Sequence, residues 1–489
     1  MAQARLDAVR QQRIEKLQKL REAGVAPYPA RFAKKQLCVQ VADFLDKQIN
    51  TAGRIMAIRG HGKMVFMDLA DQSGGVQLWF KEDKLGKSYR LLSLLDTGDF
   101  IGIEGLVVKT KSGQLSVEVS GFTVLNKTIL PLPDKWHGLK DEELRFRKRY
   151  LELLTNPEVR QMFEKKSLFW KTIRNFMLAE GFLEVETPVL ENVTGGADTT
   201  PFVTHHDALD IDVYLRISMG ELWQKRLLVG GFEKTFEIGR QFRNEGISFE
   251  HLQDYTQMEF YWAYANYEDG MDLVQKLYRQ VVKKTFGKTE FKIGDFEVDF
   301  AGDWPQLDYV DTVKQGLGID VLKASDAQLR AQLKKLKIEF EPKERRGRLI
   351  DKLWKHIRVG IAGPAFLINH PVEVSPLAKR KTDNPLLTER FQVILAGSEM
   401  GNGYSELNDP VDQAERFAQQ AQMRKEGDKE AQMHDRDFVE ALEYGMPPAC
   451  GFGVSERLFS FLMDKSAREC VMFPLLKPKG ESDGQKKTA

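Results

Sequence analysis

Hydrophobic and polar positions change their spacing along this chain, and each change predicts a different kind of element. Over residues 1–23, apolar side chains recur at near-helical spacing among basic ones, which predicts a basic amphipathic helix that ends at Gly24. Such a helix either contacts a nucleic-acid phosphate backbone or packs on the next domain, and both interpretations stay open. From about residue 50, short alternating runs predict five strands, with a hairpin turn at Gly74 and Gly75.

A helical stretch is expected between the third and fourth of these strands, and that element order is typical of an OB-fold barrel. Such a barrel is suited to single-stranded nucleic acid. We expect Phe66 and Trp79 on one face together with Gln77, where aromatic rings and an amide can stack on and bond unpaired bases. The alternative is that these aromatic side chains belong to the barrel core.

The rest of the chain predicts a second, larger domain in which helices and strands are mixed. A proline-containing segment is followed by helical patterns, then by strands from about 185 to 265, and finally by a strand-to-helix segment. The fold class is therefore α+β. We expect a basic helical extension at 1–48, an OB-fold domain at 49–130, a linker at 131–145, a domain at 146–475 with a helical insertion at about 305–360, and a disordered tail at 476–489.

Composition narrows the class of protein. The chain has 489 residues, of which 42% are hydrophobic and 29% charged, and no apolar run approaches the roughly 20 residues that cross a bilayer. The charged N-terminus lacks the features of a secretory signal, and three widely spaced cysteines suggest neither a disulfide framework nor a zinc site. We expect a cytoplasmic, globular protein without a membrane segment. A net charge of +1 leaves nucleic-acid binding to local patches.

The segment TFEIGRQFRNEGISFEHLQDYTQMEFYWAY predicts two antiparallel strands joined by a charged loop. Side chains alternate along a strand, so Glu259 and Tyr261 point into a common space. In the loop, Arg243 or Arg240 offers a guanidinium that can neutralise a reacting phosphate, and Glu245 can accept a hydrogen bond from an adenine amino group. A charged hairpin loop is also the ordinary form of an exposed turn.

Three segments resemble, in order, the three signature motifs of class II aminoacyl-tRNA synthetases: GFLEVETPVL (181–190), FRNE (242–245) and GFGVSERLFSFL (451–462). Other segments look like the lysine-specific branch of that family in particular: GGADTTPFVTHHDALDIDVYLRIS, HPVEVSPLAKRK and EMGNGYSELNDP. The resemblance covers roughly residues 50–475. It implies a catalytic domain built on an antiparallel sheet, homodimerisation around Pro188, and ATP-dependent joining of L-lysine to tRNA(Lys).

The resemblance also assigns roles to individual residues. It implies that Arg243 binds the ATP α-phosphate and the lysine carboxylate, and that Arg457 binds the γ-phosphate; both are expected to be catalytic. Glu245 and His251 are expected to contact adenine. The expected ATP-binding set is Arg243, Glu245, His251, Glu399, Gly453 and Arg457.

A buried substrate ammonium needs carboxylates and amide oxygens around it, because an unpaired buried charge is very costly. The matching positions are Glu221, Glu259 and Glu406, with Tyr261, Asn402 and Tyr404 beside them and Gly196 closing over the amino-acid backbone. Such an acidic pocket favours lysine over aspartate or asparagine.

Glu399 is the expected ligand of Mg²⁺, which prefers hard oxygen ligands. The chain departs from the family pattern at Gln392, where a second glutamate is usual, and an amide there brings no charge. Phe66 and Gln77 are the expected anticodon contacts. Two alternatives to a tRNA ligase are a lysine-transferring paralogue that modifies a protein, which would generally lack the barrel, and a non-catalytic RNA-binding derivative, against which the retained arginines argue.

Overall fold

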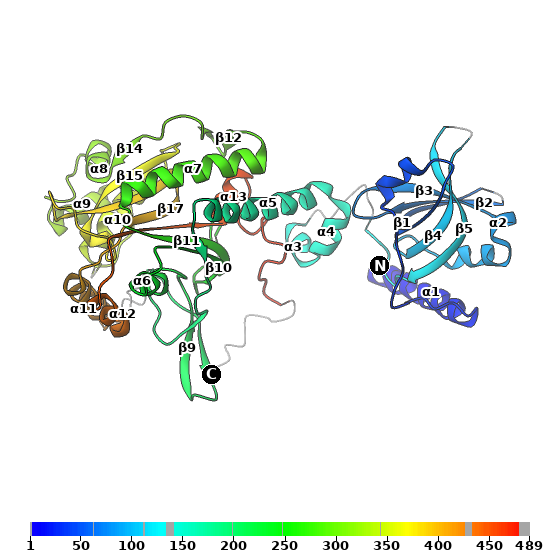
Figure 1. Ribbon diagram of the computed structural model, residues 1–489, viewed down its shortest axis with the longest axis horizontal. Coiled ribbons are helices and arrows are strands. Elements are labelled where there is room, and N and C mark those ends of the chain that lie inside the picture. Colours follow the sequence, from blue (N-terminus) through cyan, green and yellow to red (C-terminus); the bar gives the residue numbers. More distant parts are fainter. Residues whose placement is uncertain are drawn as a thin grey trace. The chain divides into compact units, whose positions relative to one another are not determined.

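The computed structural model describes residues 2–61, 63–110, 113–133, 141–197, 199–246, 248–342, 344–425 and 433–478 (Figure 1). The chain divides into two compact units, Met1–Thr155 and Asn156–Ala489. Residues 134–140 of the expected linker and residues 479–489 of the expected tail lie outside the described residues. Within the described ranges, no helix combines the length and the apolar character needed to cross a bilayer.

The first unit contains a closed five-stranded barrel in the order β1-β2-β3-β5-β4, which confirms the five predicted strands. The strands are β1 (Gln48–His61), β2 (Met64–Ala70), β3 (Gly75–Lys81), β4 (Phe100–Lys109) and β5 (Leu115–Asn126). The short helices are η1 (Cys38–Phe44), α2 (Glu82–Leu85), η2 (Gly86–Leu94), α3 (Glu142–Arg147) and α4 (Arg149–Thr155). As predicted, the helical stretch of α2 and η2 lies between β3 and β4.

Alternation along the strands separates the barrel core from its outer face. Met67, Leu78 and Phe80 are fully buried, and each such side chain contributes about 1.5–3 kcal/mol relative to an exposed one. Phe66 and Trp79 lie opposite each other on β2 and β3, half-buried on the outer face, and their rings stack with centroids 5.9 Å apart. These two aromatic side chains are therefore outside the barrel core.

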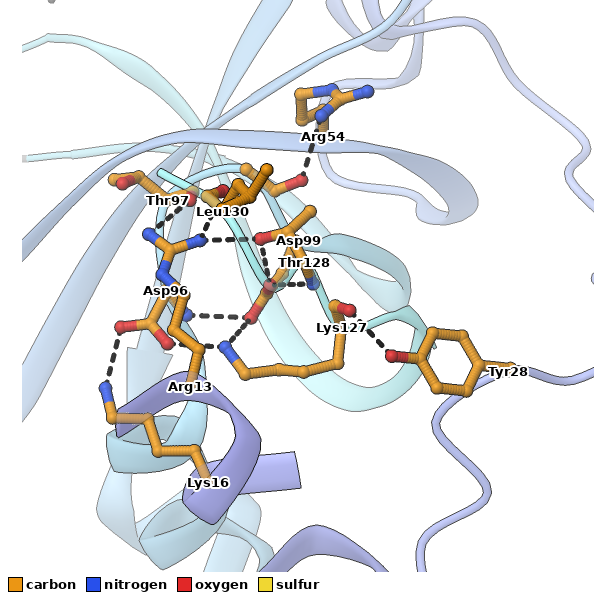
Figure 2. Close-up of polar contacts among 11 residues, drawn as sticks. Arg13, Lys16, Tyr28, Arg54, Asp96, Thr97, Asp99, Lys127, Thr128 and Leu130 are labelled. Atoms are coloured by element: carbon orange, nitrogen blue, oxygen red, sulfur yellow. Dashed lines mark hydrogen bonds and ion pairs between the residues drawn. The ribbon is translucent and has the colours of Figure 1, made fainter. Parts of the chain in front are cut away.

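Helix α1 (Ala2–Glu22) packs against the barrel, as one of the two interpretations expected. Figure 2 shows Arg13 and Lys16 directed toward the loops that flank β4 and follow β5. Arg13 is buried and donates to Thr128 Oγ1 at 2.8 Å, while Lys16 pairs with Asp96 at 2.7 Å. Beneath them, the fully buried Lys127 and Asp99 form an ion pair at 2.9 Å. Two of the helix's basic side chains thus hold it in place, and its outer basic residues stay exposed.

The second unit is built on an eight-stranded sheet in the order β14-β15-β16-β17-β18-β11-β10-β6. Its strands are β6 (Leu183–Glu184), β10 (Lys234–Phe242), β11 (Asp254–Ala263), β14 (Gln306–Asp308), β15 (Ala365–Pro371), β16 (Leu387–Leu395), β17 (Ser398–Ser405) and β18 (Ala449–Ser455). All pairs from β15 to β10 are antiparallel, which confirms the predicted antiparallel core. Helix α7 (Tyr267–Phe286) packs against β16, β17 and β18 (Figure 1).

Smaller elements complete this unit. Two small sheets contain β7 (Leu190–Glu191), β8 (Val203–His206) and β9 (Ile211–Leu215), and β12 (Glu290–Ile293) with β13 (Phe296–Asp299). The remaining helices are α5 (Pro157–Ala179), α6 (Trp223–Val229), α8 (Tyr309–Leu317), α9 (Asp326–Lys335), α10 (Arg346–Arg358), η3 (Val372–Val374), α11 (Pro410–Lys425), α12 (Arg436–Glu443) and α13 (Arg457–Leu462).

The segment expected as a solvated helical insertion contains β14 and the three helices α8, α9 and α10. These helices are amphipathic rather than polar on all sides, and they bury their own apolar cluster. Its fully buried members include Leu329 and Leu333 of α9 and Leu349 and Leu353 of α10, spaced three to four residues apart. The many lysines and arginines of this segment obscure that periodicity in the sequence.

Candidate active site

A cavity of about 580 Å³ opens over strands β17, β18 and β11 of the second unit. Every site residue predicted for this unit lines it: Gly196, Glu221, Arg243, Glu245, His251, Glu259, Tyr261, Gln392, Glu399, Asn402, Tyr404, Glu406, Gly453 and Arg457. Residues separated by more than 250 positions in the chain therefore converge on one space.

Glycines of β18 make room for the floor of the cavity. Gly451 pairs with Tyr261 on one side and Tyr404 on the other, and Gly453 pairs with Glu259 and Asn402. A Cβ atom at position 451 would overlap the carboxylate of Glu406 and the ring of Tyr261. The large polar side chains of the neighbouring strands therefore occupy space that any other residue at Gly451 would fill.

Three buried carboxylates surround one end of the cavity: Glu221, Glu259 and Glu406. Tyr404 donates a hydrogen bond to Glu221, and Tyr261 donates to the same carboxylate at 3.2 Å. Ser218 donates to Glu259 at 3.1 Å. Gly196 lies against this group with φ +88°, where its missing side chain avoids a clash with Glu221. The arrangement gathers negative charge in a space suited to a cationic side chain.

Burial and mutual repulsion change the proton affinity of these carboxylates. Burial, followed by the charge of Glu221, raises the pKa of Glu259 to about 7. Burial also raises the pKa of Glu406 well above its ordinary value, against the opposing effect of Lys225. A carboxyl held in this way is poised to ionise when a cation enters beside it, because the cation favours the charged form.

The loop between β10 and β11 places the other predicted residues at the opposite end of the cavity. The guanidinium of Arg243 lies 5.6 Å from the ring centroid of Tyr255, and its buried Nε has no hydrogen-bond partner among the described residues. Glu245 is bonded by Thr199, and His251 Nδ1 lies 2.7 Å from Ser248 Oγ. Burial, with Arg457 as a further cause, lowers the pKa of His251, so its ring is neutral at neutral pH.

The structure separates the two arginines that the sequence left open. Arg243 lines the cavity, whereas Arg240 points away from it and pairs with Asp254 at the edge of the hairpin. Arg457, at the start of α13, enters the cavity from the far side. It donates to the backbone oxygen of Glu399 and lies 3.4 Å from Glu250, and its buried Nε has no hydrogen-bond partner in the described part of the chain. Two arginines with unused donors thus face the cavity from different elements.

Comparison with known proteins identifies the family of both units. The model for class II tRNA synthetases (D, K and N) matches residues 141–477, and the model for the OB-fold nucleic acid binding domain matches residues 49–125. The lysine–tRNA ligase of Thermotoga maritima is 45% identical over 488 residues, covering 97% of each chain. The lysine–tRNA ligase of Carboxydothermus hydrogenoformans is 44% identical over 476 residues, covering 96% of this chain and 97% of its own. The chain belongs to the lysine–tRNA ligase family.

One important residue of the lysine–tRNA ligase cavity region was not among the predicted site residues. Lys225 of α6 is fully buried and forms ion pairs with both Glu221 and Glu406. Burial alone would lower the pKa of Lys225, but these two carboxylates raise it above the ordinary value. The spacing of four residues between Glu221, just before α6, and Lys225 within it was a usable signal for this pair. Its contact with Glu406, 181 positions later in the chain, had no such signal.

Glu399 is held by donors from two directions. Trp354 Nε1 donates to one carboxylate oxygen at 3.2 Å, and Gln392 Nε2 donates to the other at 3.1 Å. The carbonyl of Gln392 in turn lies 3.1 Å from Nε2 of the buried His370. Because burial lowers the pKa of His370 well below its ordinary value, the imidazole is neutral and donates this hydrogen bond. Gln392 is therefore engaged as a hydrogen-bonding amide.

The family implies a bound metal ion, and the donors around Glu399 limit which ion fits. Within the described ranges, no group of three or more His, Cys, Asp or Glu side chains is placed to hold a metal ion. The single carboxylate of Glu399 fits an ion such as Mg²⁺, which keeps several waters and takes further ligands from substrate phosphates. The donor set does not fit a second ion with its own carboxylate, because Gln392 carries no charge.

Proposed function

We propose that this chain is a lysine–tRNA ligase that activates L-lysine with ATP and transfers it to the 3′ end of tRNA(Lys). The observation that supports lysine as the substrate is the group of Glu221, Glu259 and Glu406. These three carboxylates exceed the one positive charge that the buried Lys225 brings to them. A lysine ammonium supplies the missing positive charge. A substrate carboxylate, as in aspartate, would be repelled by the same group.

The proposed reaction consists of two nucleophilic displacements. The lysine carboxylate attacks the α-phosphorus of ATP, the bond to the bridging oxygen breaks, and pyrophosphate leaves. A terminal hydroxyl of tRNA then attacks the acyl carbon of lysyl-adenylate, and AMP leaves. Neither step needs a covalent intermediate on the protein, so the side chains act by orienting the reactants and stabilising charge.

Each group has a proposed part in these steps. Arg243 neutralises the α-phosphate and orients the lysine carboxylate, while Arg457 binds the γ-phosphate. Glu245 and His251 contact the adenine, and Gly453 leaves room for ATP on the sheet. Tyr261, Asn402 and Tyr404 complete the lysine pocket with Gly196 above it. Mg²⁺ bound at Glu399 would neutralise phosphate charge and act as a Lewis acid.

The barrel is proposed to bind the anticodon of tRNA(Lys). Phe66 and Trp79 present stacked rings on its outer face, and Gln77 lies on the same strand as Trp79 with its side chain on the same side. Stacking rings beside an amide can bind unpaired bases and distinguish among them. We therefore assign residues 49–130 to tRNA recognition and residues 146–475 to catalysis.

A homodimer in the cytoplasm is the proposed form of the protein. The exposed large apolar side chains between residues 168 and 209 are Leu168, Leu178, Leu183, Val189, Leu190, Val203 and Leu209. They lie on α5, on the small strands that follow it and in the turns beside these strands, around Pro188, and apolar surface of this kind is typical of contacts between subunits. The cytoplasmic location follows from the proposed role, because translation consumes the product there.

The direct test is ATP–pyrophosphate exchange with each of the twenty amino acids. We expect exchange with lysine alone, and a loss of about 10²–10³-fold in Arg243→Ala, as for other groups that stabilise transition-state charge. Arg240→Ala is a matched control, because this arginine lies on the preceding strand but outside the cavity, and it should keep full activity. Exchange with a different amino acid would contradict the assignment of the pocket, and no exchange at all would contradict the proposed function.

A further inference from the structure

Helix α10 presents one charged face to the catalytic cavity. Arg348, Asp351, Lys355 and Arg358 line the cavity together with Trp354, at spacings of three to four residues along the helix. Lys355 pairs with Asp351 at 2.8 Å, so one of these cations is already neutralised within the helix. The opposite face of α10 is packed into the apolar cluster that it shares with α9. The helix is therefore held firmly while its charged face borders the site.

Arg358 occupies a particular place on this face. Its Nη1 donates to the backbone oxygen of Gly397 at 2.6 Å, in the turn between β16 and β17. Its Nε lies 3.6 Å from Glu399, which is too long for a hydrogen bond, and this buried nitrogen has no hydrogen-bond partner in the part of the chain that the structure describes. Leaving a buried donor unpaired is costly, so the site is expected to supply an acceptor when it is filled.

A second guanidinium, that of Arg457, lies nearby and also has an unused hydrogen-bond donor. Arg457 donates to the backbone oxygen of Glu399, and its Nε is likewise buried without a hydrogen-bond partner among the described residues. Burial lowers the pKa of Arg457 against the opposing charges of Glu250 and Glu399, and the charge of Arg358 lowers it further, which agrees with two cations near each other. Arg358 lies beside the carboxylate of Glu399 and Arg457 beside that of Glu250, while Gln392, which donates to Glu399, brings no charge. Two converging guanidiniums with unused donors favour an anion with several oxygens.

We propose that Arg358 is a phosphate-binding residue that acts with Arg457 to hold the terminal phosphates of ATP and the pyrophosphate product. The inference rests on the function proposed above, since it assigns a further contact within the same site. This role of Arg358 explains how Glu399 can be sufficient as a metal ligand without a second glutamate at position 392. A fixed arginine of α10 neutralises phosphate charge in addition to any ion bound at Glu399. Planar guanidiniums bind phosphate oxygens in pairs and suit this role.

The tRNA acceptor end is the other phosphate-bearing ligand that could approach α10. The position of Arg358 favours the terminal phosphates of ATP instead. Its guanidinium is mostly shielded from solvent, with a side-chain exposure of 19%, and it lies beside Glu399 within the cavity. Lys355, which is 55% exposed, is the better candidate for a contact with a large ligand.

The test is binding of inorganic pyrophosphate to the full chain, measured by calorimetry in EDTA and repeated with Mg²⁺. Arg358→Gln keeps an amide that can donate to Gly397 but removes the charge. We expect it to weaken pyrophosphate binding on the order of tenfold in EDTA, because a charge-assisted bond is lost. Lys352→Gln is the matched control: this lysine of α10 pairs with Glu344 and does not line the cavity, and it should change nothing.

A kinetic measurement separates this role from a purely structural one. In Arg358→Gln the KM for pyrophosphate in lysine-dependent exchange should rise on the order of tenfold while the KM for lysine is unchanged. Arg358→Lys, which keeps the charge but not the paired geometry, should give a smaller increase of about threefold and serves if the first variant does not fold. An unchanged pyrophosphate affinity, or an increase confined to the KM for tRNA, would overturn the proposal. Arg358-dependent pyrophosphate binding without lysine-dependent exchange in the wild type would overturn the proposed function and leave this inference standing.

Discussion

The two units each bury a cluster of charged side chains, and the two clusters are balanced differently. Under α1, Asp96 and Asp99 lie among Lys16, Lys127 and Arg13, and all five side chains have partners at hydrogen-bonding distance (Figure 2). In the cavity, Lys225 pairs with Glu221 and Glu406, while Glu259 forms no ion pair with any described residue. The first cluster is complete by itself, whereas the second carries an excess of carboxylates.

The pKa values of the carboxyl groups differ between the two clusters in the same way. Burial would raise the pKa of Asp96, but hydrogen bonds from Lys127 and Lys16 lower it below its ordinary value. In the cavity, burial prevails, so the pKa of Glu259 rises to about 7 and that of Glu406 rises well above its ordinary value. A buried charge cluster that is balanced stabilises a fold, and one that lacks a partner indicates a ligand of the opposite charge.

The largest expected effect comes from removing the central cation of either cluster. Lys225→Met leaves Glu221 and Glu406 buried without their partner, and Lys127→Met does the same to Asp99; each should lower the free energy of unfolding by about 3–5 kcal/mol. The difference between the two clusters is tested by measuring the free energy of unfolding of each variant with and without L-lysine. Lysine should stabilise Lys225→Met more than it stabilises the wild type, because the substrate ammonium can enter that cluster. In Lys127→Met the lysine-dependent gain should equal that of the wild type, and a larger gain there would contradict the contrast.

A smaller effect is expected when one carboxylate of the cavity is neutralised. Glu259→Gln should raise the KM for lysine by roughly 10–150-fold, equivalent to the about 1.5–3 kcal/mol of a hydrogen bond to a charged group, and leave the KM for ATP unchanged. Glu191→Gln is the matched control, because Glu191 is equally buried but bonded to Trp223 and does not line the cavity. An equal rise in both variants would show a general effect on packing.

The same carboxyl predicts a dependence on pH. With its pKa raised to about 7 in the empty site, Glu259 must lose a proton before it can pair with the substrate ammonium, so the KM for lysine should rise as the pH falls below about 7. Without lysine, the folded state binds more protons than the unfolded chain between the ordinary value of 4.5 and about 7. The contribution of Glu259 to the free energy of unfolding therefore falls as the pH rises through this range. Both slopes should be smaller in Glu259→Gln; the stability slope should not vanish, because burial also raises the pKa of Glu191 to about 7.

The smallest expected effect concerns the stacked rings of Phe66 and Trp79 on the outer face of the barrel. Phe66→Ala removes one of two stacked rings, and the loss of one stacked base costs about 1 kcal/mol or somewhat more. We expect the KM for tRNA in aminoacylation to rise several-fold, while lysine-dependent ATP–pyrophosphate exchange stays the same. A decrease in exchange would place the ring in the folding of the barrel rather than in tRNA binding.

Much of this arrangement could be predicted from the sequence where local pattern decides it. The spacing of apolar residues predicted a helix at 1–23, and the structure has this helix at Ala2–Glu22. Strand alternation predicted that Glu259 and Tyr261 share one space, and both line the cavity. The pairing of Lys225 with Glu406 and the approach of Arg358 to Glu399 could not be predicted in the same way. They depend on how α6 packs against β10 and β11 and how α10 packs against α8 and η3, which no local period encodes.

The glycines of β18 also constrain how this site can change. Every replacement of glycine adds at least a methyl group, so no substitution at Gly451 enlarges the cavity, and each one intrudes on Tyr261 and Glu406. Substitutions at Gly451 can therefore only make the site smaller. Adaptation to a different amino acid must therefore proceed through the carboxylate walls, where Glu221, Glu259 and Glu406 can each be exchanged for a neutral residue of similar volume.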